Sequence, residues 1–185
     1  MSNRYRQSDI PQIPNKNVFF DANVLIYVFW PTLNSDSNSP AIRYSSILGT
    51  LFRNGFKLYL NSTIVSEAIN RVLRIEYEKY KVAHNVSNLA FKDYRDSADG
   101  MLVQQDVFGM FNNRILNLFS VKEKCLTKDM VKSFLTIDSL DFNDKIIVDI
   151  CKSNGFVLLT HDKDFANEDV DIISANGNFF TNPTP

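Results

Sequence analysis

Four acidic residues stand directly after or beside apolar segments of the chain: Asp21, Glu67, Asp144 and Asp162. Asp21 closes the apolar run at 17–20, and Asp162 follows the run at 156–160. If both runs are parallel strands, the two aspartates emerge at the same edge of the sheet, which is where α/β folds bind ligands. Hard divalent cations prefer oxygen ligands. The placement therefore predicts one metal-binding cleft.

The remaining residues narrow the choice of metal. Carboxylates that converge without a cation repel one another and raise some of their pKa values, and a divalent ion would relieve that repulsion while holding a phosphate. The two histidines, His84 and His161, are far apart in sequence, and Cys125 and Cys151 do not form a metal-type pair. This pattern offers no convincing zinc site. We expect Mg²⁺ or Mn²⁺, and the sequence does not choose between one ion and two.

Apolar runs alternate with helical patterns along the chain, which predicts an α/β fold with a parallel sheet. Strands are expected at 18–20, 56–60, 156–160 and 171–174. Helices are expected at 23–29, from Pro40 to the stop signal at Gly55, at 63–80, at 129–135, and from Asp141 through Cys151, with Gly155 as its end. Ser39 and Asn61 have the residue types that cap helix N-termini.

We divide the chain into a flexible or loosely docked N-terminal arm at 1–16, marked by Pro11 and Pro14, and a single domain at 17–185. The stretch 31–39 is predicted to be a loop. A helical insertion around 84–135 interrupts the alternation, and periodicity does not decide whether it is a lid, a partner groove or a dimer face.

The bulk composition indicates a soluble globular protein. The 185 residues are 44% hydrophobic and 22% charged, with a net charge of −1, so charge neither supports nor excludes RNA binding. The most apolar stretch, 18–30, is interrupted by Asp21 and Asn23 and is too short to span a bilayer. The N-terminus has no apolar stretch of a secretory signal, and the two cysteines fit reduced thiols, so we expect a cytoplasmic protein that does not contact membranes.

Four segments taken in order resemble the PIN-domain nucleases: residues 18–26, 64–67, 141–147 and 159–165. The likeness covers nearly the whole chain from Asn17 onward, except for the helical middle. The resemblance implies a PIN-like three-layer fold, with a central parallel sheet flanked by helices. It also implies a Mg²⁺- or Mn²⁺-dependent ribonuclease site. The length and the opening Asp21-Ala22-Asn23 are most similar to the VapC-type toxins of toxin–antitoxin pairs.

The resemblance also implies roles for particular residues. The acidic set is Asp21, Glu67, Asp144 and Asp162, and the supporting polar positions are Asn23, Thr160 and Asp164. We expect Asp21 and Asp144 to bind the metal directly, Asp162 to bind it or orient water, and Glu67 to act through water. Thr160 would hydrogen-bond Asp21, and Arg71 or Arg74 would contact RNA phosphates. The expected partners are RNA, a small antitoxin protein and a second copy of the chain.

Each of these residues also has a purely structural interpretation. Asp21 could simply cap the following helix, Asp144 could serve the helix dipole, and Asp141 is the better candidate for that cap. Glu67 on a polar helix stripe could be solvated, and Asp164 could only form a turn. Trp30 and the phenylalanines are interpreted as core or dimer contacts and not as surfaces for stacking bases.

Two other functions remain open. The chain could be a non-catalytic PIN-like module that binds RNA or protein, although the complete acidic set favours an enzyme. It could also be a hydrolase of small phosphate esters. That chemistry needs a nucleophilic aspartate or a phosphate loop, and no glycine-rich loop is visible.

Overall fold

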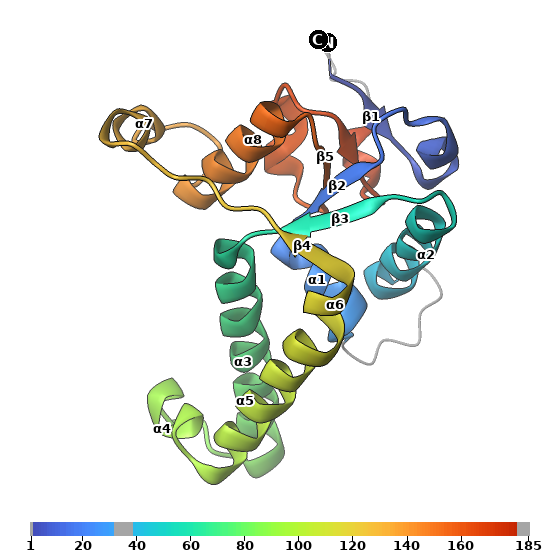
Figure 1. Cartoon of the computed structure of the whole chain (residues 1–185). Helices are drawn as coiled ribbons and strands as arrows, with labels where there is room; N and C mark the ends of the chain where they lie inside the picture. Colours follow the sequence, from blue (N-terminus) through green and yellow to red (C-terminus); the bar gives the residue numbers. More distant parts are fainter. Residues whose placement is uncertain (1, 32–38, 181–185) are drawn as a thin grey trace.

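The computed structural model describes residues 2–31 and 39–180 and is built on one six-stranded parallel sheet (Figure 1). The strand order is β1-β6-β5-β2-β3-β4, and every neighbouring pair is parallel. The strands are β1 (Arg4–Tyr5), β2 (Asn17–Phe20), β3 (Lys57–Leu60), β4 (Phe119–Val121), β5 (Val157–Leu159) and β6 (Ile172–Ile173). The predicted α/β class, with a parallel sheet between helices in a three-layer arrangement, is confirmed.

Eight α-helices accompany the sheet within the described residues. They are α1 (Ala22–Phe29), α2 (Pro40–Arg53), α3 (Ser62–His84), α4 (Phe91–Arg95), α5 (Ala98–Met110), α6 (Leu116–Leu118), α7 (Lys128–Phe134) and α8 (Phe142–Asn154). A π-helical turn, Phe111–Ile115, joins α5 to α6. Short 3₁₀ helices cover Gln7–Gln12, Lys163–Asn167 and Gly177–Phe179.

The helix boundaries follow the predicted signals. The Ser39 and Asn61 side chains accept hydrogen bonds from the first turns of α2 and α3, and Asp141 does the same for α8. Gly155 ends α8 in the left-handed conformation with φ 63°, which a residue without Cβ adopts freely. The predicted loop over residues 32–38 lies outside the described part of the chain.

The sheet reverses its direction of growth beside β2. From β2 the chain builds outward through β3 to β4, then crosses back and builds the other side through β5 and β6. The carboxyl ends of β2 and β5 therefore border the point where strand order reverses, which is the usual ligand crevice of open α/β sheets. Asp21 and Thr160 are the first residues after these two strands.

The N-terminal segment packs into the domain over its described residues, 2–16, and there differs from the flexible or loosely docked arm predicted at 1–16. Arg4 and Tyr5 form the strand β1, in register with Ile172 and Ile173 of β6. Ile10 and Ile13 are buried in the main core. Pro11 and Pro14 suggested a loop in the sequence. The segment is nevertheless held in the domain by the buried Ile10 and Ile13 and by the pairing of β1 with β6.

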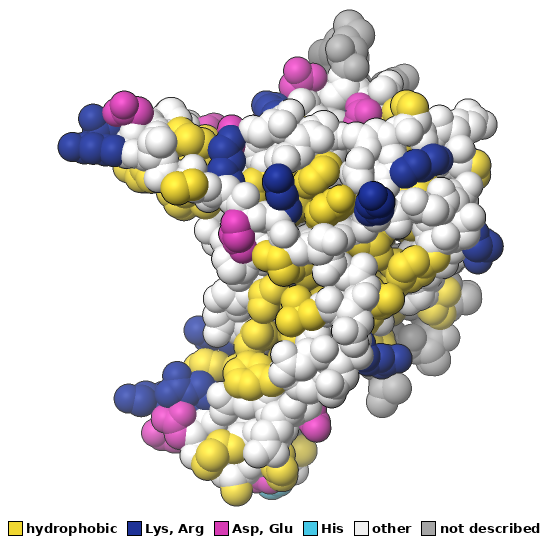
Figure 2. Space-filling model, viewed as in Figure 1, with side chains coloured by type: hydrophobic (Ala, Val, Ile, Leu, Met, Phe, Trp, Pro, Cys, Tyr) yellow, Lys and Arg dark blue, Asp and Glu magenta, His cyan; other side chains and the backbone are white. Residues whose placement is uncertain are grey.

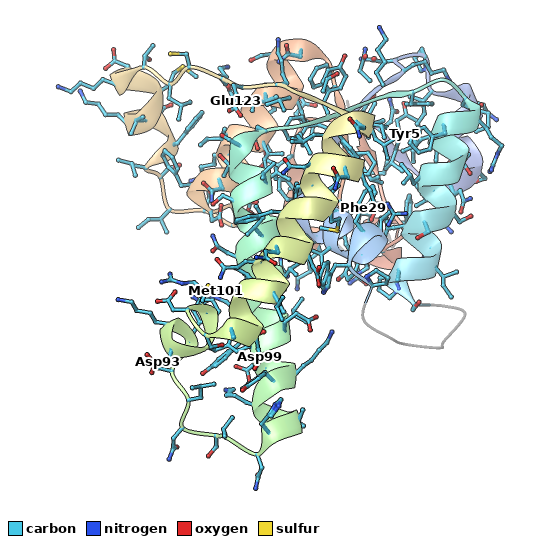
Figure 3. All side chains as sticks on the ribbon, turned by 60° about the horizontal axis from the view of Figure 1, so that its bottom comes forward. Tyr5, Phe29, Asp93, Asp99, Met101 and Glu123 are labelled. Carbon is cyan, nitrogen blue, oxygen red and sulfur yellow. The ribbon has the colours of Figure 1, made fainter. Side chains whose placement is uncertain are left out.

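The insertion at 84–135 is also not purely helical, because it supplies a strand of the sheet. Phe119–Val121 pairs with β3 as the edge strand β4. Before it, α3 extends beyond the sheet and packs against α4 and α5. Figure 3 shows Asp93, Asp99 and Met101 toward the far end of this projection, with Phe29 nearer the sheet. The short helix expected at 129–135 is present as α7.

The core is continuous across the sheet and its helices. Figure 2 shows one side of the molecule hollowed between the projection formed by α3 to α5 and the one formed by α7, with hydrophobic side chains gathered along the middle. In the described ranges, none of the helices has the length and apolar character needed to cross a bilayer.

Candidate functional site

Asp21 occupies the centre of the candidate site because two strands place it there. Phe20 of β2 is in register with Leu159 of β5, and the Asp21 amide donates to the Leu159 carbonyl at 3.0 Å. The carboxylate then reaches Thr160, whose hydroxyl donates to Asp21 Oδ2 at 2.7 Å. Asp21 is only 4% exposed and Thr160 is fully buried. Thr160 thus makes the predicted contact with Asp21.

The Asp21 carboxylate has contacts that a helix cap alone does not need. Asp21 is the residue before α1, and burial raises its pKa against the lowering effect of a backbone hydrogen bond from Asn23, in the first turn of that helix. Its Oδ2 also accepts from the Thr160 hydroxyl and from the side-chain amide of Asn23, the latter at 3.3 Å. Side chains that follow β5 and begin α1 therefore hold the carboxylate at the sheet edge, in addition to the helix backbone.

Thr160 also connects Asp21 to the next acidic residues. Its hydroxyl oxygen accepts a hydrogen bond from the Asp162 amide at 2.9 Å. The Asp162 carboxylate in turn accepts from the Asp164 amide at 3.0 Å, beginning the turn Lys163–Asn167. One buried hydroxyl therefore sets the chain path by which Asp162 and Asp164 follow the strand.

A tyrosine from α2 supports the same strand end. The Tyr44 hydroxyl donates to the Thr160 carbonyl at 3.0 Å and accepts from the Ala175 amide at 3.2 Å. Burial raises the pKa of Tyr44 to about 12, so it stays a neutral donor at physiological pH. Spacing along a helix does not reveal this contact, because Tyr44 and the Thr160 carbonyl are 116 residues apart in the sequence.

Glu67 enters the site through an arginine and an asparagine. Arg71 donates to the side-chain oxygen of Asn23 and, at 3.4 Å, to Glu67 Oε1 one turn earlier on α3. Asn23 donates its amide hydrogen to Asp21. Through this chain of contacts, α3 is tied to the end of β2, and the Glu67 carboxylate lies on the side of α3 that faces Asp21.

Asp144 and Asp141 form a reciprocal cap at the start of α8. The Asp144 amide donates to Asp141 Oδ1 at 2.8 Å, and the Asp141 amide donates to Asp144 Oδ2 at 3.3 Å. Asp141 is thus the helix cap that the sequence indicates. Asp144 shares the capping arrangement, which leaves its other carboxylate oxygen for a second partner.

The pKa values show that the acidic residues act on one another. Burial is the largest cause of the raised pKa of Asp21, and the charge of Asp162 adds to it. Burial and then the charge of Asp21 raise the pKa of Glu67, against the lowering effect of Arg71. Burial raises the pKa of Asp144 to about 7, with further contributions from Asp141, Asp21 and Asp162. The four predicted acids therefore form one electrostatic cluster.

The cluster is not a ready-made metal centre. Among the residues that the structure describes, no three His, Cys, Asp or Glu side chains form a group that could hold a metal ion. Asp144 Oδ2 and Asp162 Oδ1 each accept a hydrogen bond from an amide of their own turn.

A polar groove of about 660 Å³ lies beside the cluster along α3. Glu67, Arg71 and Arg74 line one side, and Asn143 reaches it from α8. Arg74 also lies 4.6 Å from the centroid of the Phe91 ring, so its guanidinium is steadied by a cation–π contact. Both arginines predicted to contact RNA thus border the same groove.

One participant in the site, Asp141, and one contact, that between Arg71 and Asn23, were not identified from the sequence. Asp141 was set apart as a cap, yet its charge acts on both Glu67 and Asp144. The bond from Arg71 to Asn23 joins residues 48 positions apart, and spacing within α3 could indicate only the pair of Arg71 with Glu67.

Comparison with known proteins does not assign the chain to a family. No protein-family model matches the chain, and no curated protein matches it.

Proposed function

We propose that this chain is a divalent-metal-dependent endoribonuclease of PIN-like architecture, acting on RNA phosphodiester bonds. The observation that carries the proposal is the convergence of four acids, Asp21, Glu67, Asp144 and Asp162, at the switch point of a parallel sheet. The pKa values of Asp21, Glu67 and Asp144 are raised. Clusters of acids with perturbed pKa values in a cleft are characteristic of functional sites.

The donor set fits Mg²⁺ or Mn²⁺. It consists of carboxylate oxygens, which these hard cations prefer, and the mutual repulsion of the acids would be relieved by a positive ion. Asp21 and Asp144 would hold the ion, with Asp162 beside them and Glu67 acting through water. When bound, the ion would activate water as a nucleophile and neutralise charge on the phosphate.

The protein's own groups have the remaining tasks. Thr160 and Asn23 fix the Asp21 carboxylate by hydrogen bonds, so its orientation does not depend on the ion. Arg71 and Arg74 line the groove along α3 and would receive the RNA backbone. A place as the toxin of a toxin–antitoxin pair, with a small antitoxin and a homodimer, belongs to the same proposal and rests on the resemblance of the four sequence segments.

The test is RNA cleavage by the purified chain with Mg²⁺, Mn²⁺ or a chelator, on a mixture of structured and single-stranded RNAs. Asp21→Asn and Asp144→Asn should each reduce metal-dependent cleavage at least about 100-fold, the size expected when a group central to the transition state is lost. Asp129→Asn is the matched control, because Asp129 is a fully solvated acid on α7 outside the cluster.

The outcomes separate the alternatives. Equal cleavage by wild type and Asp144→Asn would point to contamination or to a different site. RNA binding without cleavage by the wild-type chain would favour the non-catalytic module, and calorimetric titration with Mn²⁺ would then show whether the cluster still binds the ion.

A further inference from the structure

A cavity of about 260 Å³ lies next to the acidic cluster, between α1, the start of α2 and the middle of α3. Its apolar lining includes Tyr27, Trp30, Ala41 and Ile75. Asn23 and Arg71 contribute polar groups to the same cavity. It is slightly smaller than the range of about 300–1,000 Å³ typical of sites for drug-sized ligands, and so suits one planar ring system.

Contacts with the rest of the protein hold both aromatic rings. The Trp30 indole nitrogen donates to Glu76 Oε1 at 2.8 Å, which fixes the ring relative to α3. The Tyr27 ring stacks on Tyr44, with centroids 5.8 Å apart and planes at 13°, and meets His161 edge-on at 5.5 Å. The aromatic lining is therefore formed before any ligand arrives, which lowers the entropy cost of binding.

The cavity shares two residues with the acidic site and its groove. Asn23 lines the cavity and donates to the Asp21 carboxylate. Arg71 lines both the cavity and the groove along α3, and it bonds Asn23 and Glu67. The cavity with its aromatic lining thus lies next to the Arg71 guanidinium, which in turn contacts the Glu67 carboxylate. A ligand that combines a planar ring with a nearby phosphate has the matching chemistry.

We propose that this cavity binds one unpaired nucleobase of the RNA substrate, next to the phosphate held at the acidic cluster; the proposal rests on the nuclease function above. Single-stranded bases are recognised by stacking on aromatic side chains and arginine planes. Trp30, assigned from sequence to core or dimer contacts, is then part of the substrate site. The cavity makes the enzyme selective for single-stranded RNA, because a paired base cannot enter.

Trp30 is the only tryptophan of the chain, so its fluorescence reports on the cavity directly. The experiment titrates the full chain, in chelator to prevent cleavage, with the hexamers rA₆, rU₆ and rC₆ and with an abasic hexamer of the same charge. At least one base-containing hexamer should quench Trp30 and bind about 5- to 150-fold more tightly than the abasic one, the range expected for stacking one base.

Ala41→Phe places a ring inside the cavity without changing an acidic residue. It should abolish the quenching and reduce affinity to that of the abasic hexamer. Ile42→Phe is the matched control, since Ile42 is the neighbouring residue, is 49% exposed and does not line the cavity. It should bind like the wild type, and thermal melts establish that both variants are folded.

A second pair of variants keeps the test decisive if Ala41→Phe does not fold. With fluorescein-labelled hexamers read by anisotropy, Trp30→Phe should retain most of the preference for bases over the abasic chain, and Trp30→Leu should lose it. Equal binding of abasic and base-containing hexamers, quenching that survives in Ala41→Phe, or no binding of any hexamer would each overturn the base-pocket proposal.

The two proposals fail separately. Metal-dependent cleavage with equal binding of abasic RNA would leave the nuclease standing and remove the base pocket. Base-dependent quenching in a chain that cleaves nothing would leave the pocket standing and remove the nuclease.

Discussion

The Asp21 carboxylate is almost fully buried, and its partners are two neutral groups, Thr160 and Asn23. A carboxylate in such surroundings is costly to ionise, because burial penalises its charged form more than two hydrogen bonds compensate. The arrangement stores unfavourable electrostatic energy that a cation would release.

The pH dependence of stability caused by Asp144 can be used to measure the cost of ionising an acid in this cluster. Its pKa of about 7 in the folded chain exceeds the ordinary value near 4, so the folded state holds the proton more tightly than the unfolded state does. The resulting stabilisation is present below pH 4 and is lost as the pH rises through about 7. In chelator, Asp144→Asn should therefore be more stable than wild type at pH 8 and close to it at pH 4.

The expected gain at pH 8 is about 1–2 kcal/mol after allowance for solvent screening, because Asp144 is partly exposed. That corresponds to about 2–8 °C in Tm for a chain of this length, measured by thermal melts at both pH values. A difference between wild type and variant that is the same at pH 4 and pH 8 would show that Asp144 does not titrate in this way.

At the scale of residues, part of the site could be predicted from the sequence. Asp21, Thr160 and Asp162 were predictable because they follow buried strands, and parallel register alone brings them together. The hydrogen bond between Arg71 and Asn23 was not predictable, because it depends on how α3 packs against α1. The cavity beside Trp30 depends on the same packing, with α2 as its third wall.

Among the elements, α3 combines three separate requirements. Its buried cap Asn61 receives the Ile64 amide, its apolar side packs on the core, and its polar side presents Glu67 and Arg71 to the groove. The apolar positions at helical spacing predicted the second requirement, and the residue type of Asn61 predicted the first. The sequence of α3 alone does not distinguish this polar side from an ordinary solvent-exposed one. The distinction comes from α8, which lies across the groove.

The corner between α4 and α5 depends on a glycine. A Cβ at Gly100 would lie 2.0 Å from the Tyr94 carbonyl oxygen and 2.8 Å from that of Arg95. Both contacts are with backbone, so Gly100→Ala should force the corner apart and lower the free energy of unfolding by about 1–3 kcal/mol. Urea denaturation followed by circular dichroism would measure the loss.

Gly109→Ala is the control on the same helix, because its Cβ would meet nothing closer than 3.9 Å. Replacing this glycine should raise stability by about 0.5–1 kcal/mol through helix propensity. If both alanines destabilised the protein equally, the close approach at Gly100 would not be the cause.

The two strands missed from the sequence share a physical reason. β5 and β6 are equally short, but they lie in apolar runs, whereas β1 (Arg4–Tyr5) and β4 (Phe119–Val121) include polar residues and β4 directly follows a helical stretch. Their pairing comes from the neighbouring strands β6 and β3. Longer elements with clear caps, such as α2 and α8, were located to within a few residues because local signals suffice there.

Across the whole molecule, Arg4 joins the two ends of the described chain. Its guanidinium donates to three carbonyls near β6, those of Val170, Ala166 and Glu168, at 2.7, 2.8 and 2.6 Å. Arg4→Met keeps the apolar stem and removes all three bonds, so it should lower the free energy of unfolding by about 1.5–4 kcal/mol. The matched control is Arg95→Met, because Arg95 is half-exposed and among the described residues its guanidinium pairs only with its neighbour Asp96. This change should leave the Tm unchanged.

Thermal and urea melts of both variants test this assignment. Equal stability of Arg4→Met and wild type would mean that β1 is held by its strand pairing and the buried isoleucines alone, without a contribution from the arginine.

The pairing of β1 with β6 has a consequence for how the protein is made. A ribosome produces Arg4 and Tyr5 well before their partners Ile172 and Ile173, which follow more than 160 residues later. Asp21 likewise can form its hydrogen bond with Thr160 only after the chain has been extended by the 139 residues that lead to it. Contacts this distant in sequence form late in folding, after long loops have closed. In a nascent chain Asp21 therefore lacks its partner until Thr160 has been synthesised, and any cleft that acts on RNA is assembled only after that point.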